Sequence, residues 1–162
     1  MAAATFVIAF AATSALGLRV NASPSLPLGL YQATSTNSGL VEFCPDEPAA
    51  SVAIKRGYRQ GGSCPDGAAP LLKPIVAQAG DVVRLSENGI EVNEHHLPNT
   101  APLSADTAAR PLVHWPYGTY LVKAGELWVA STYNARSFDS RYFGPIRESV
   151  IRSRVRPVLV LK

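Results

Sequence analysis

Two serines near the N-terminus, Ser23 and Ser25, are spaced so that they could act together on one substrate. Residues i and i+2 of an extended chain point to the same side, so both hydroxyls can face one site. Pro24 and Pro27 restrict the backbone around them, and Gly29 permits a turn or a close backbone approach. A rigidly held pair of hydroxyls indicates a nucleophile with a helper. The alternative interpretation is a proline-rich linker that follows an anchor.

A second group of polar side chains lies in residues 131–145, where charged, hydroxyl and aromatic residues are close together. In an extended chain Ser137, Asp139 and Arg141 would share one face, where hydrogen bonds could satisfy a buried ion pair. A surface loop with an ordinary salt bridge is the alternative. The spacing by itself leaves both interpretations open.

An uncharged apolar stretch, residues 1–18, precedes the serine pair and ends at Arg19. As a helix it would be roughly 27 Å long, slightly short of the hydrocarbon core of a bilayer. A short membrane anchor, a cleaved secretory signal and a buried helix are the three interpretations. The stretch lacks a basic region, which argues against an ordinary signal peptide and leaves the topology poorly specified. We expect export or anchoring, with residues 19–162 forming one domain.

The cysteine content agrees with export. Cys44 and Cys64 are the two cysteines, too few for a structural zinc site without histidine ligands. His95, His96 and His114 lie far away in the sequence without metal-type spacing, so we expect no metal site. A disulfide across this loop would stabilise the fold by roughly 3 kcal/mol and would imply an oxidising compartment such as the periplasm. Two free buried thiols are the alternative.

Composition predicts a turn-rich β protein. The chain has 162 residues, of which 47% are hydrophobic, with 13 prolines and 12 glycines, which fits a single globular domain. The net charge is only +3. Four arginines cluster near the C-terminus, Arg147, Arg152, Arg154 and Arg156, but few aromatic residues lie among them and no helix-turn-helix pattern occurs. We therefore expect a solvated face that could meet anionic lipid, and no nucleic-acid partner.

The elements that would position these residues are mostly strands. The pattern predicts strands at residues 30–34, 40–43, 71–78, 81–86, 90–93, 119–122, 126–131 and 155–161. An Asn-Gly turn should join 81–86 to 90–93 in a hairpin, and residues 123–125 should join the next two strands in another. Pro157 indicates an edge position for the last strand. Regular alternation of strands and helices is absent, which argues against a parallel α/β sheet.

The segment between the cysteines has a different character. Asp46 can cap a helix that has Pro48 in its first turn, and apolar residues follow at helical spacing from residue 50 to 58. Gly57 interrupts or ends this helix. We expect a small helical insert, residues 44–64, attached to a mainly β body by a Cys44–Cys64 disulfide.

These segments carry a family resemblance. Residues 137–144, Ser-Phe-Asp-Ser-Arg-Tyr-Phe-Gly, resemble the C-terminal box of type I signal peptidases. Residues 21–31 resemble the serine box of the conjugal-transfer branch of that family, Asn-x-Ser/Thr-x-Ser-x-Pro-x-Gly-Leu-Tyr. Lys73, with the Gly80-Asp81 pair that follows, resembles the lysine box, and residues 88–93 and 97–99 resemble the next hairpin. Lys73-Pro74 replaces the more usual Lys-Arg pair, which leaves the strand register open.

The resemblance implies roles for the site residues. Ser25 is the nucleophile and Lys73 its base, since no histidine lies in the matched boxes. Burial would lower the pKa of the lysine toward working pH. The Ser23 hydroxyl and the Ser25 N–H would hold the oxyanion, while Ser137 would orient the amine. Asp139 paired with Arg141 would brace the wall of the site. The implied fold is a mainly β, antiparallel signal-peptidase-like fold with an N-terminal hydrophobic helix.

The implied function is maturation of a pilin precursor for conjugative transfer, with a linear or a cyclic product. The partners would be this precursor, other conjugative transfer and type IV secretion components, and membrane lipid, with no cofactor. The protein would lie in the periplasm, held at the inner membrane by residues 1–18. A general signal peptidase is a second hypothesis, against which the Ser-x-Pro-x-Gly serine box and small size argue. A non-catalytic periplasmic domain is the third, against which the intact Ser25 and Lys73 argue.

Overall fold

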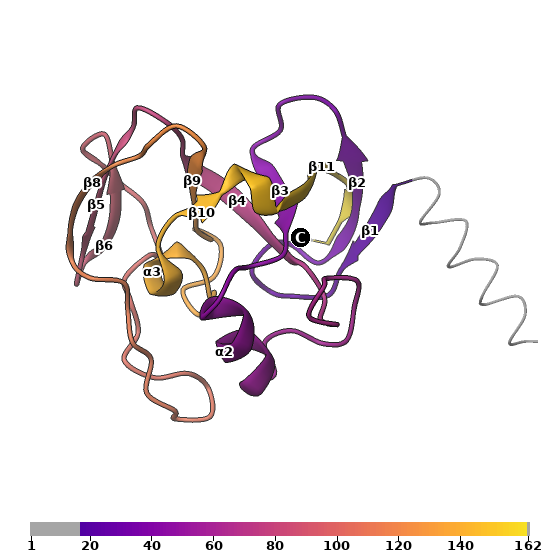
Figure 1. Cartoon of the computed structure of the whole chain (residues 1–162), viewed down its shortest axis with the longest axis horizontal. Helices are drawn as coiled ribbons and strands as arrows, with labels where there is room; N and C mark the ends of the chain where they lie inside the picture. Colours follow the sequence, from indigo (N-terminus) through magenta and orange to yellow (C-terminus); the bar gives the residue numbers. More distant parts are fainter. Residues whose placement is uncertain (1–16, 162) are drawn as a thin grey trace, which may run out of the picture.

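Seven strands form the larger of two antiparallel sheets in the computed structural model, which describes residues 17–161 (Figure 1). Every pair of neighbouring strands in this sheet is antiparallel. In spatial order the strands are β1 (Leu18–Asn21), β2 (Gly29–Thr34), β11 (Ile151–Val160), β3 (Leu40–Phe43), β4 (Leu71–Ala77), β9 (Glu126–Val129) and β10 (Ile146–Arg147). The sheet therefore places β2 between the first and the last described strands, β1 and β11.

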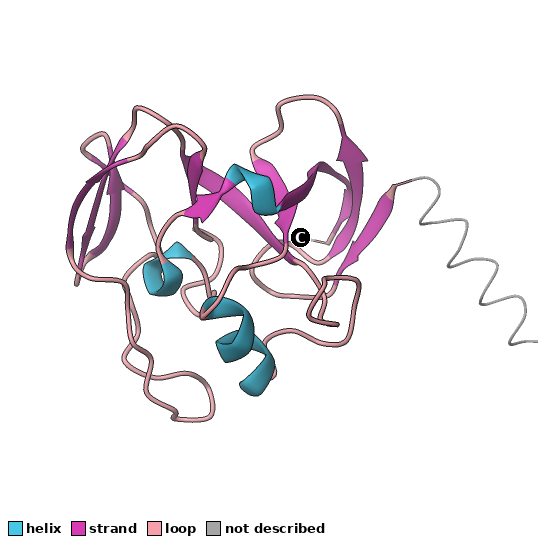
Figure 2. Cartoon of the chain, in the orientation of Figure 1, coloured by secondary structure: helices cyan, strands magenta, loops and turns pink. Residues whose placement is uncertain are grey.

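The smaller sheet has four strands and lies at the opposite end of the molecule from β1 (Figure 1). Its spatial order is β7 (His95–His96), β6 (Gly89–Val92), β5 (Val82–Ser86) and β8 (Gly118–Leu121). The β5–β6 hairpin pairs Ser86 with Gly89, so the hairpin predicted from the Asn-Gly turn is confirmed. Strands dominate the described chain and its helices are short (Figure 2). The prediction of a mainly β, antiparallel fold is therefore confirmed.

Two predicted strand relationships are wrong. The strands at 119–122 and 126–131 do not pair: β8 pairs with β5, whereas β9 pairs with β4 and β10. The turn between them passes the chain from one sheet to the other, with Val122 and Trp128 buried in a shared cluster. The last strand is not at an edge, because β11 lies between β2 and β3. Pro157 is tolerated there because pairing with β3 has already ended at Val155.

The predicted helical insert is present as α2 (Ala49–Lys55), and the Cys44–Cys64 disulfide is formed, so this prediction is confirmed. The predicted cap is wrong. Pro48 is the N-cap residue, with no side-chain capping bond, and Asp46 instead accepts hydrogen bonds from Arg147 at 2.9 and 3.2 Å. The remaining helices within residues 17–161 are α3 (Ser140–Phe143) and the 3-10 turn η1 (Glu148–Val150).

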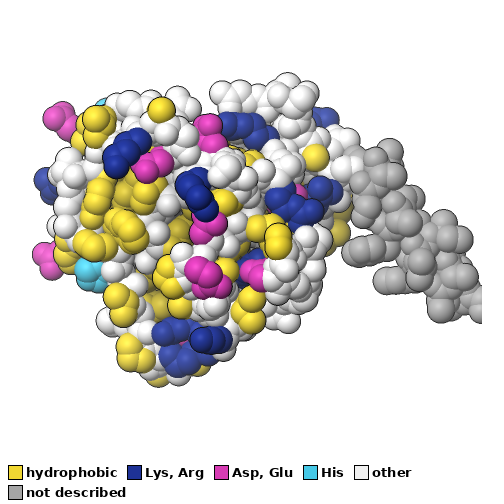
Figure 3. Space-filling view, viewed as in Figure 1, with side chains coloured by type: hydrophobic (Ala, Val, Ile, Leu, Met, Phe, Trp, Pro, Cys, Tyr) yellow, Lys and Arg dark blue, Asp and Glu magenta, His cyan; other side chains and the backbone are white. Residues whose placement is uncertain are grey.

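The arginines of the C-terminal cluster each have a different hydrogen-bond partner. Arg147 pairs with Asp46, Arg152 donates to Ser63 and Arg154 donates to a backbone carbonyl. Figure 3 shows acidic and basic side chains interspersed on the face in view, with hydrophobic side chains gathered toward the smaller sheet. The chain thus neutralises part of the positive charge that its C-terminal sequence concentrates.

The core consists of three apolar clusters, and one of them supports the serine segment. In that cluster Leu26, Tyr31 and Val155 pack together, with Tyr31 only 1% exposed. Burial of a large apolar side chain contributes roughly 1.5–3 kcal/mol, so Leu26 holds the segment that contains Ser25 against the larger sheet. The other clusters centre on Trp128 and on Phe43.

The expected anchor lies outside the described residues, except that Leu18 begins β1. Within residues 17–161 no helix is both long enough and apolar enough to span a bilayer.

Candidate active site

The serine segment forms a tight turn between β1 and β2 instead of the extended chain that the spacing predicted. Its two hydroxyls still meet: Ser23 Oγ lies 3.2 Å from Ser25 Oγ. At the end of the turn Gly29 has φ of +149°, and a Cβ there would lie 2.1 Å from the carbonyl oxygen of Leu159. The close backbone approach expected at Gly29 is therefore present, and it packs the end of the turn against β11.

Asn21 organises this turn, a role that the sequence did not suggest. Its side-chain amide donates to the carbonyls of Ser23, Leu26 and Pro27 at 3.0, 3.3 and 3.1 Å. Its side-chain oxygen accepts the Ser23 N–H at 3.1 Å. Because a single buried side chain bonds both ends of the turn, the two serines are held in a fixed relationship. The only sequence signal was the position of Asn21 at the start of the serine box.

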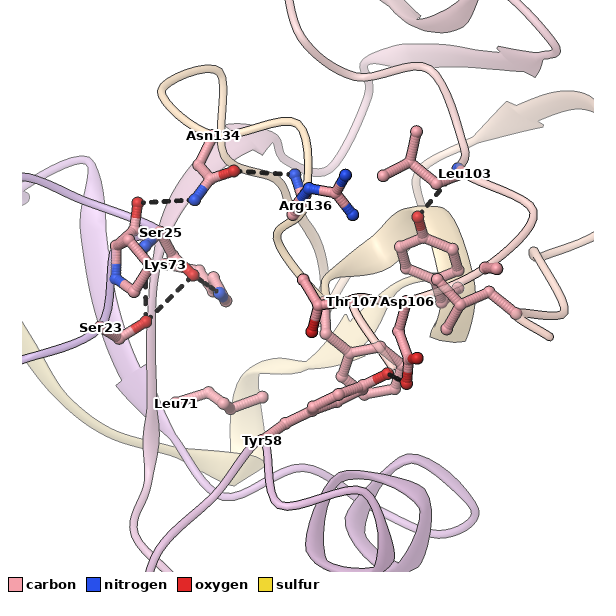
Figure 4. Close-up of a pocket in the computed structure, with 15 residues that line it drawn as sticks. Ser23, Ser25, Tyr58, Leu71, Lys73, Leu103, Asp106, Thr107, Asn134 and Arg136 are labelled. Carbon is pink, nitrogen blue, oxygen red and sulfur yellow. Dashed lines mark hydrogen bonds between the residues drawn. The ribbon is translucent and has the colours of Figure 1, made fainter. Parts of the chain in front are cut away.

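Lys73 lies beside Ser25 at one end of the cleft (Figure 4) and also contacts Ser137. It lies within β4, opposite Val41 of β3. Its Nζ is 2.5 Å from Ser25 Oγ and 2.9 Å from Ser137 Oγ. The three residues are buried, with Lys73 only 3% exposed. The structure thus brings together a hydroxyl, an amine and a second hydroxyl from three distant segments.

Burial governs the ionisation of this amine. Desolvation lowers the pKa of Lys73 from 10.5 to about 8, the negative charge of Asp139 opposes the shift, and the positive charge of Arg141 adds to it. No carboxylate lies within ion-pair distance of the Lys73 amine in the described chain. A substantial neutral fraction of the amine is therefore available in mildly alkaline solution, which a general base requires.

Asp139 and Arg141 form a fully buried ion pair near Lys73. Ser25 and Lys73 are together called the dyad below. Arg141 Nε and Nη2 donate to the two carboxylate oxygens at 2.8 and 2.9 Å, and both residues are 0% exposed. The predicted extended geometry is wrong, because Asp139 is the N-cap of α3 and Arg141 lies inside that helix. Arg141 also donates to the carbonyl of Ser137 at 3.0 Å. The pair thus supports the loop that presents the Ser137 hydroxyl to Lys73.

Two further residues of the same loop contact the serine turn and were not singled out from the sequence. Ser131 Oγ donates to the carbonyl oxygen of Ser25 at 2.6 Å. Asn134 Nδ2 donates to the carbonyl oxygen of Pro24 at 3.2 Å. Both residues lie inside the polar segment at 131–145, but nothing in their spacing indicates a partner more than a hundred residues away. They join this loop to the turn that carries Ser23 and Ser25.

The dyad opens into a cleft of about 260 Å³. Figure 4 shows Ser23, Ser25 and Lys73 at one end of it and Leu103, Asp106 and Thr107 at the other. A cleft of this kind can take an extended peptide with its carbonyl over the Ser25 hydroxyl. In the described part of the chain no three His, Cys, Asp or Glu side chains gather as a metal-ligand set.

Comparisons with known proteins show which family the chain belongs to. The family model described as "Signal peptidase, peptidase S26" matches residues 1–160. A plasmid transfer protein TraF from Escherichia coli is 38% identical over 149 residues, which are 90% of this chain and 84% of that protein. A probable conjugal transfer protein TraF from Sinorhizobium fredii is 36% identical, covering 88% of this chain and 77% of that protein.

Further matches include a conjugal transfer protein TraF from Agrobacterium fabrum, 36% identical, covering 88% of this chain and 82% of that protein. Among solved structures, a signal peptidase I from Enterococcus faecalis V583 aligns with 76% of this chain and 98% of its own at 16% identity, with a TM-score of 0.38.

Proposed function

Because the chain belongs to the signal peptidase family, peptidase S26, we propose that it is a serine endopeptidase with Ser25 as nucleophile and Lys73 as general base. One observation carries the proposal: the buried Lys73 amine lies 2.5 Å from the Ser25 hydroxyl. A serine hydroxyl is a weak nucleophile until a nearby base takes its proton. The short distance between the Lys73 amine and this hydroxyl supports Lys73 as the base.

In the proposed acylation step neutral Lys73 accepts the proton of Ser25 as Oγ attacks the scissile carbonyl carbon. The carbonyl π electrons move onto oxygen, forming a tetrahedral oxyanion. Collapse of this intermediate breaks the C–N bond, and the Lys73 ammonium returns its proton to the departing amine. The hydrogen bond between Lys73 and Ser137, 2.9 Å long, orients the amine throughout. The products of this step are an acyl-enzyme on Ser25 and a free C-terminal fragment.

The oxyanion would be held by the Ser25 N–H and the Ser23 hydroxyl. These groups already lie together, since Ser25 N is 3.4 Å from Ser23 Oγ. That contact is long for a hydrogen bond, so it engages the Ser25 N–H only weakly, and the Ser23 hydroxyl can rotate toward a third oxygen. Donors fixed before reaction stabilise the charge that develops on the carbonyl oxygen. The tight turn around Asn21 supplies this fixation.

The substrate we propose is a pilin precursor of conjugative transfer, because several relatives are named as plasmid or conjugal transfer proteins. Attack of water on the acyl-enzyme would release a shortened linear pilin. Attack by the α-amine of the pilin itself would release a cyclic one. In either case the enzyme would work in the periplasm, held by residues 1–18 at the membrane in which the precursor lies, together with type IV secretion components.

Mass spectrometry of the pilin precursor in cells tests the proposal. With the wild-type enzyme the precursor should lose a C-terminal peptide, and a further loss of one water would identify the cyclic product. Ser25→Ala and Lys73→Ala should each abolish the change while leaving folded protein. Ser149→Ala and Lys123→Ala are the matched controls. Both residues are exposed and lie away from the cleft, so these two variants should process the precursor normally. Normal processing in either dyad variant would overturn the mechanism.

A further inference from the structure

The cleft continues well beyond the dyad and is largely apolar there. Leu71, Leu103, Leu112, Phe138 and Tyr142 line it. Charged side chains are few: besides Lys73, the lining contains only Asp106 and Arg136. Apolar walls weaken the screening of charges. Which ligand charge the cleft would accept therefore depends on whether the charges of Asp106 and Arg136 are already paired within the protein.

The carboxylate of Asp106 is engaged by hydrogen bonds and ion pairs within the protein. It joins the disulfide-closed insert to the loop at 101–112, because it accepts the Tyr58 hydroxyl at 2.6 Å and Arg110 Nε at 2.8 Å. Arg56 Nη1 is 3.4 Å from the same carboxylate. The hydrogen bond from Tyr58, with those from the Arg110 backbone and side chain, holds the pKa of Asp106 well below its ordinary value. The charge of Asp106 is thus compensated within the protein. The residue forms part of the cleft wall opposite Ser25 and Lys73.

Arg136 is in the opposite situation. Its guanidinium makes no hydrogen bond, ion pair or ring contact within residues 17–161. Its backbone is nevertheless well placed: Arg136 N donates to Asn134 Oδ1 at 2.8 Å, and the amide of Asn134 bonds the carbonyl of Pro24. In Figure 4 the guanidinium extends from the Asn134 side of the cleft toward Leu103. The backbone of Arg136 is thus tied to the turn that carries Ser25, while its exposed guanidinium at the cleft carries a charge that no described residue compensates.

We infer that Arg136 binds a carboxylate of the peptide substrate and so selects for substrates with an acidic group close to the scissile bond. This inference rests on the proposed peptidase function and names a substrate class for it. The planar guanidinium matches a carboxylate with two parallel hydrogen bonds. The carboxylate is either an acidic side chain or the C-terminus of the precursor, and both present the same chemistry to Arg136.

A set of synthetic peptides that span the cleavage site mapped in the precursor tests the inference. In one arm each acidic side chain is replaced by its amide, and in the other the C-terminal acid is replaced by an amide. The wild-type kcat/KM should fall roughly three- to tenfold for one of these replacements. Arg136→Gln should lose the same factor on the acid peptide, and Arg136→Glu should prefer a peptide with lysine at that position. Arg152→Gln, which removes an arginine far from the cleft, serves as the charge-matched control.

The outcomes separate the two proposals. If the wild type cleaves the parent peptide but treats every acid and amide pair alike, the carboxylate inference is overturned and the peptidase proposal stands. Equal loss in Arg136→Gln and Arg152→Gln would mean a general charge effect and would also overturn it. If the wild type cleaves no peptide and leaves the precursor intact in cells, the proposed function itself fails.

Discussion

The side chain of Ser131 holds the backbone of Ser25 across 106 residues of sequence, through a 2.6 Å hydrogen bond from Ser131 Oγ to the Ser25 carbonyl oxygen. The same hydroxyl accepts the N–H groups of Tyr133 and Asn134. The Ser131 N–H donates to Asp139 at 3.0 Å. Ser131 therefore links the backbone of Ser25 to the buried ion pair and to the loop that carries Ser137.

Replacement of Ser131 should misplace the nucleophile. In Ser131→Ala the buried Ser25 carbonyl loses its partner, which should cost about 1–3 kcal/mol of stability. We expect kcat to fall roughly 10- to 100-fold, with KM close to the wild-type value, in peptide-cleavage kinetics. Ser131→Thr retains a hydroxyl and should recover most of kcat. If Ser131→Ala lowered stability without changing kcat, its role would be structural only.

The pH dependence of the reaction should follow Lys73. The pKa of this amine is lowered to about 8 by burial, and its neutral form is the active one in the proposed mechanism. Well below pH 8 kcat/KM should therefore rise about tenfold per pH unit, and it should level off above the pKa. A pH profile of peptide cleavage measures the midpoint directly. A midpoint close to the ordinary lysine value near 10.4 would show that burial does not activate the amine.

Loss of the Ser23 hydroxyl should slow the chemical step. Ser23→Ala removes one proposed oxyanion donor and leaves the dyad in place, so kcat should fall roughly 10- to 1000-fold. The measurement is single-turnover cleavage, which reports acylation without product release. The matched control is Ser149→Ala, an exposed serine outside the cleft. An unchanged single-turnover rate in Ser23→Ala would remove Ser23 from the oxyanion site.

The two ion pairs Asp139–Arg141 and Asp46–Arg147 should differ sharply in their importance for stability. Asp139→Ala leaves Arg141 charged and unpaired in a fully buried position, which should cost about 3–5 kcal/mol. Asp46→Ala breaks an exposed pair and should cost at most about 1 kcal/mol. Urea unfolding of both variants compares the free energies of unfolding. Similar values would show that the buried pair does not brace the site.

Much of the local structure could be predicted from the sequence. All eight expected strands occur, since alternation of apolar residues and turn residues such as Asn88-Gly89 act over a few positions. The helical insert and its disulfide could also be predicted, because the cysteines bracket a helical pattern. Which strands pair with one another was harder to predict, because β8 and β9 are neighbours in sequence but join different sheets. That choice depends on long-range packing around Trp128, which no local pattern reports.

The motifs shared with the family pointed to Ser25, Lys73 and Ser137, and the structure brings these three side chains within hydrogen-bonding distance. Spacing alone misjudged how this happens, because Ser23 and Ser25 lie in a turn and Asp139 caps a helix. Asn21, Ser131 and Asn134 act through contacts with backbone carbonyls. Such contacts leave no signature of their own, since any residue type offers the same carbonyl acceptor.

The sequence by itself determined which functional groups the site contains: hydroxyls, one amine and a carboxylate–guanidinium pair. It also determined the family, through motifs that run in order from residue 21 to about residue 145. Only the tertiary structure decided the ionisation of Lys73 and the charge that its cleft can accept. The pKa of Lys73 depends on how completely distant segments exclude water from the amine. The charge of Asp106 is compensated by Tyr58 and Arg56 of the disulfide-closed insert. These properties arise only when the segments pack together.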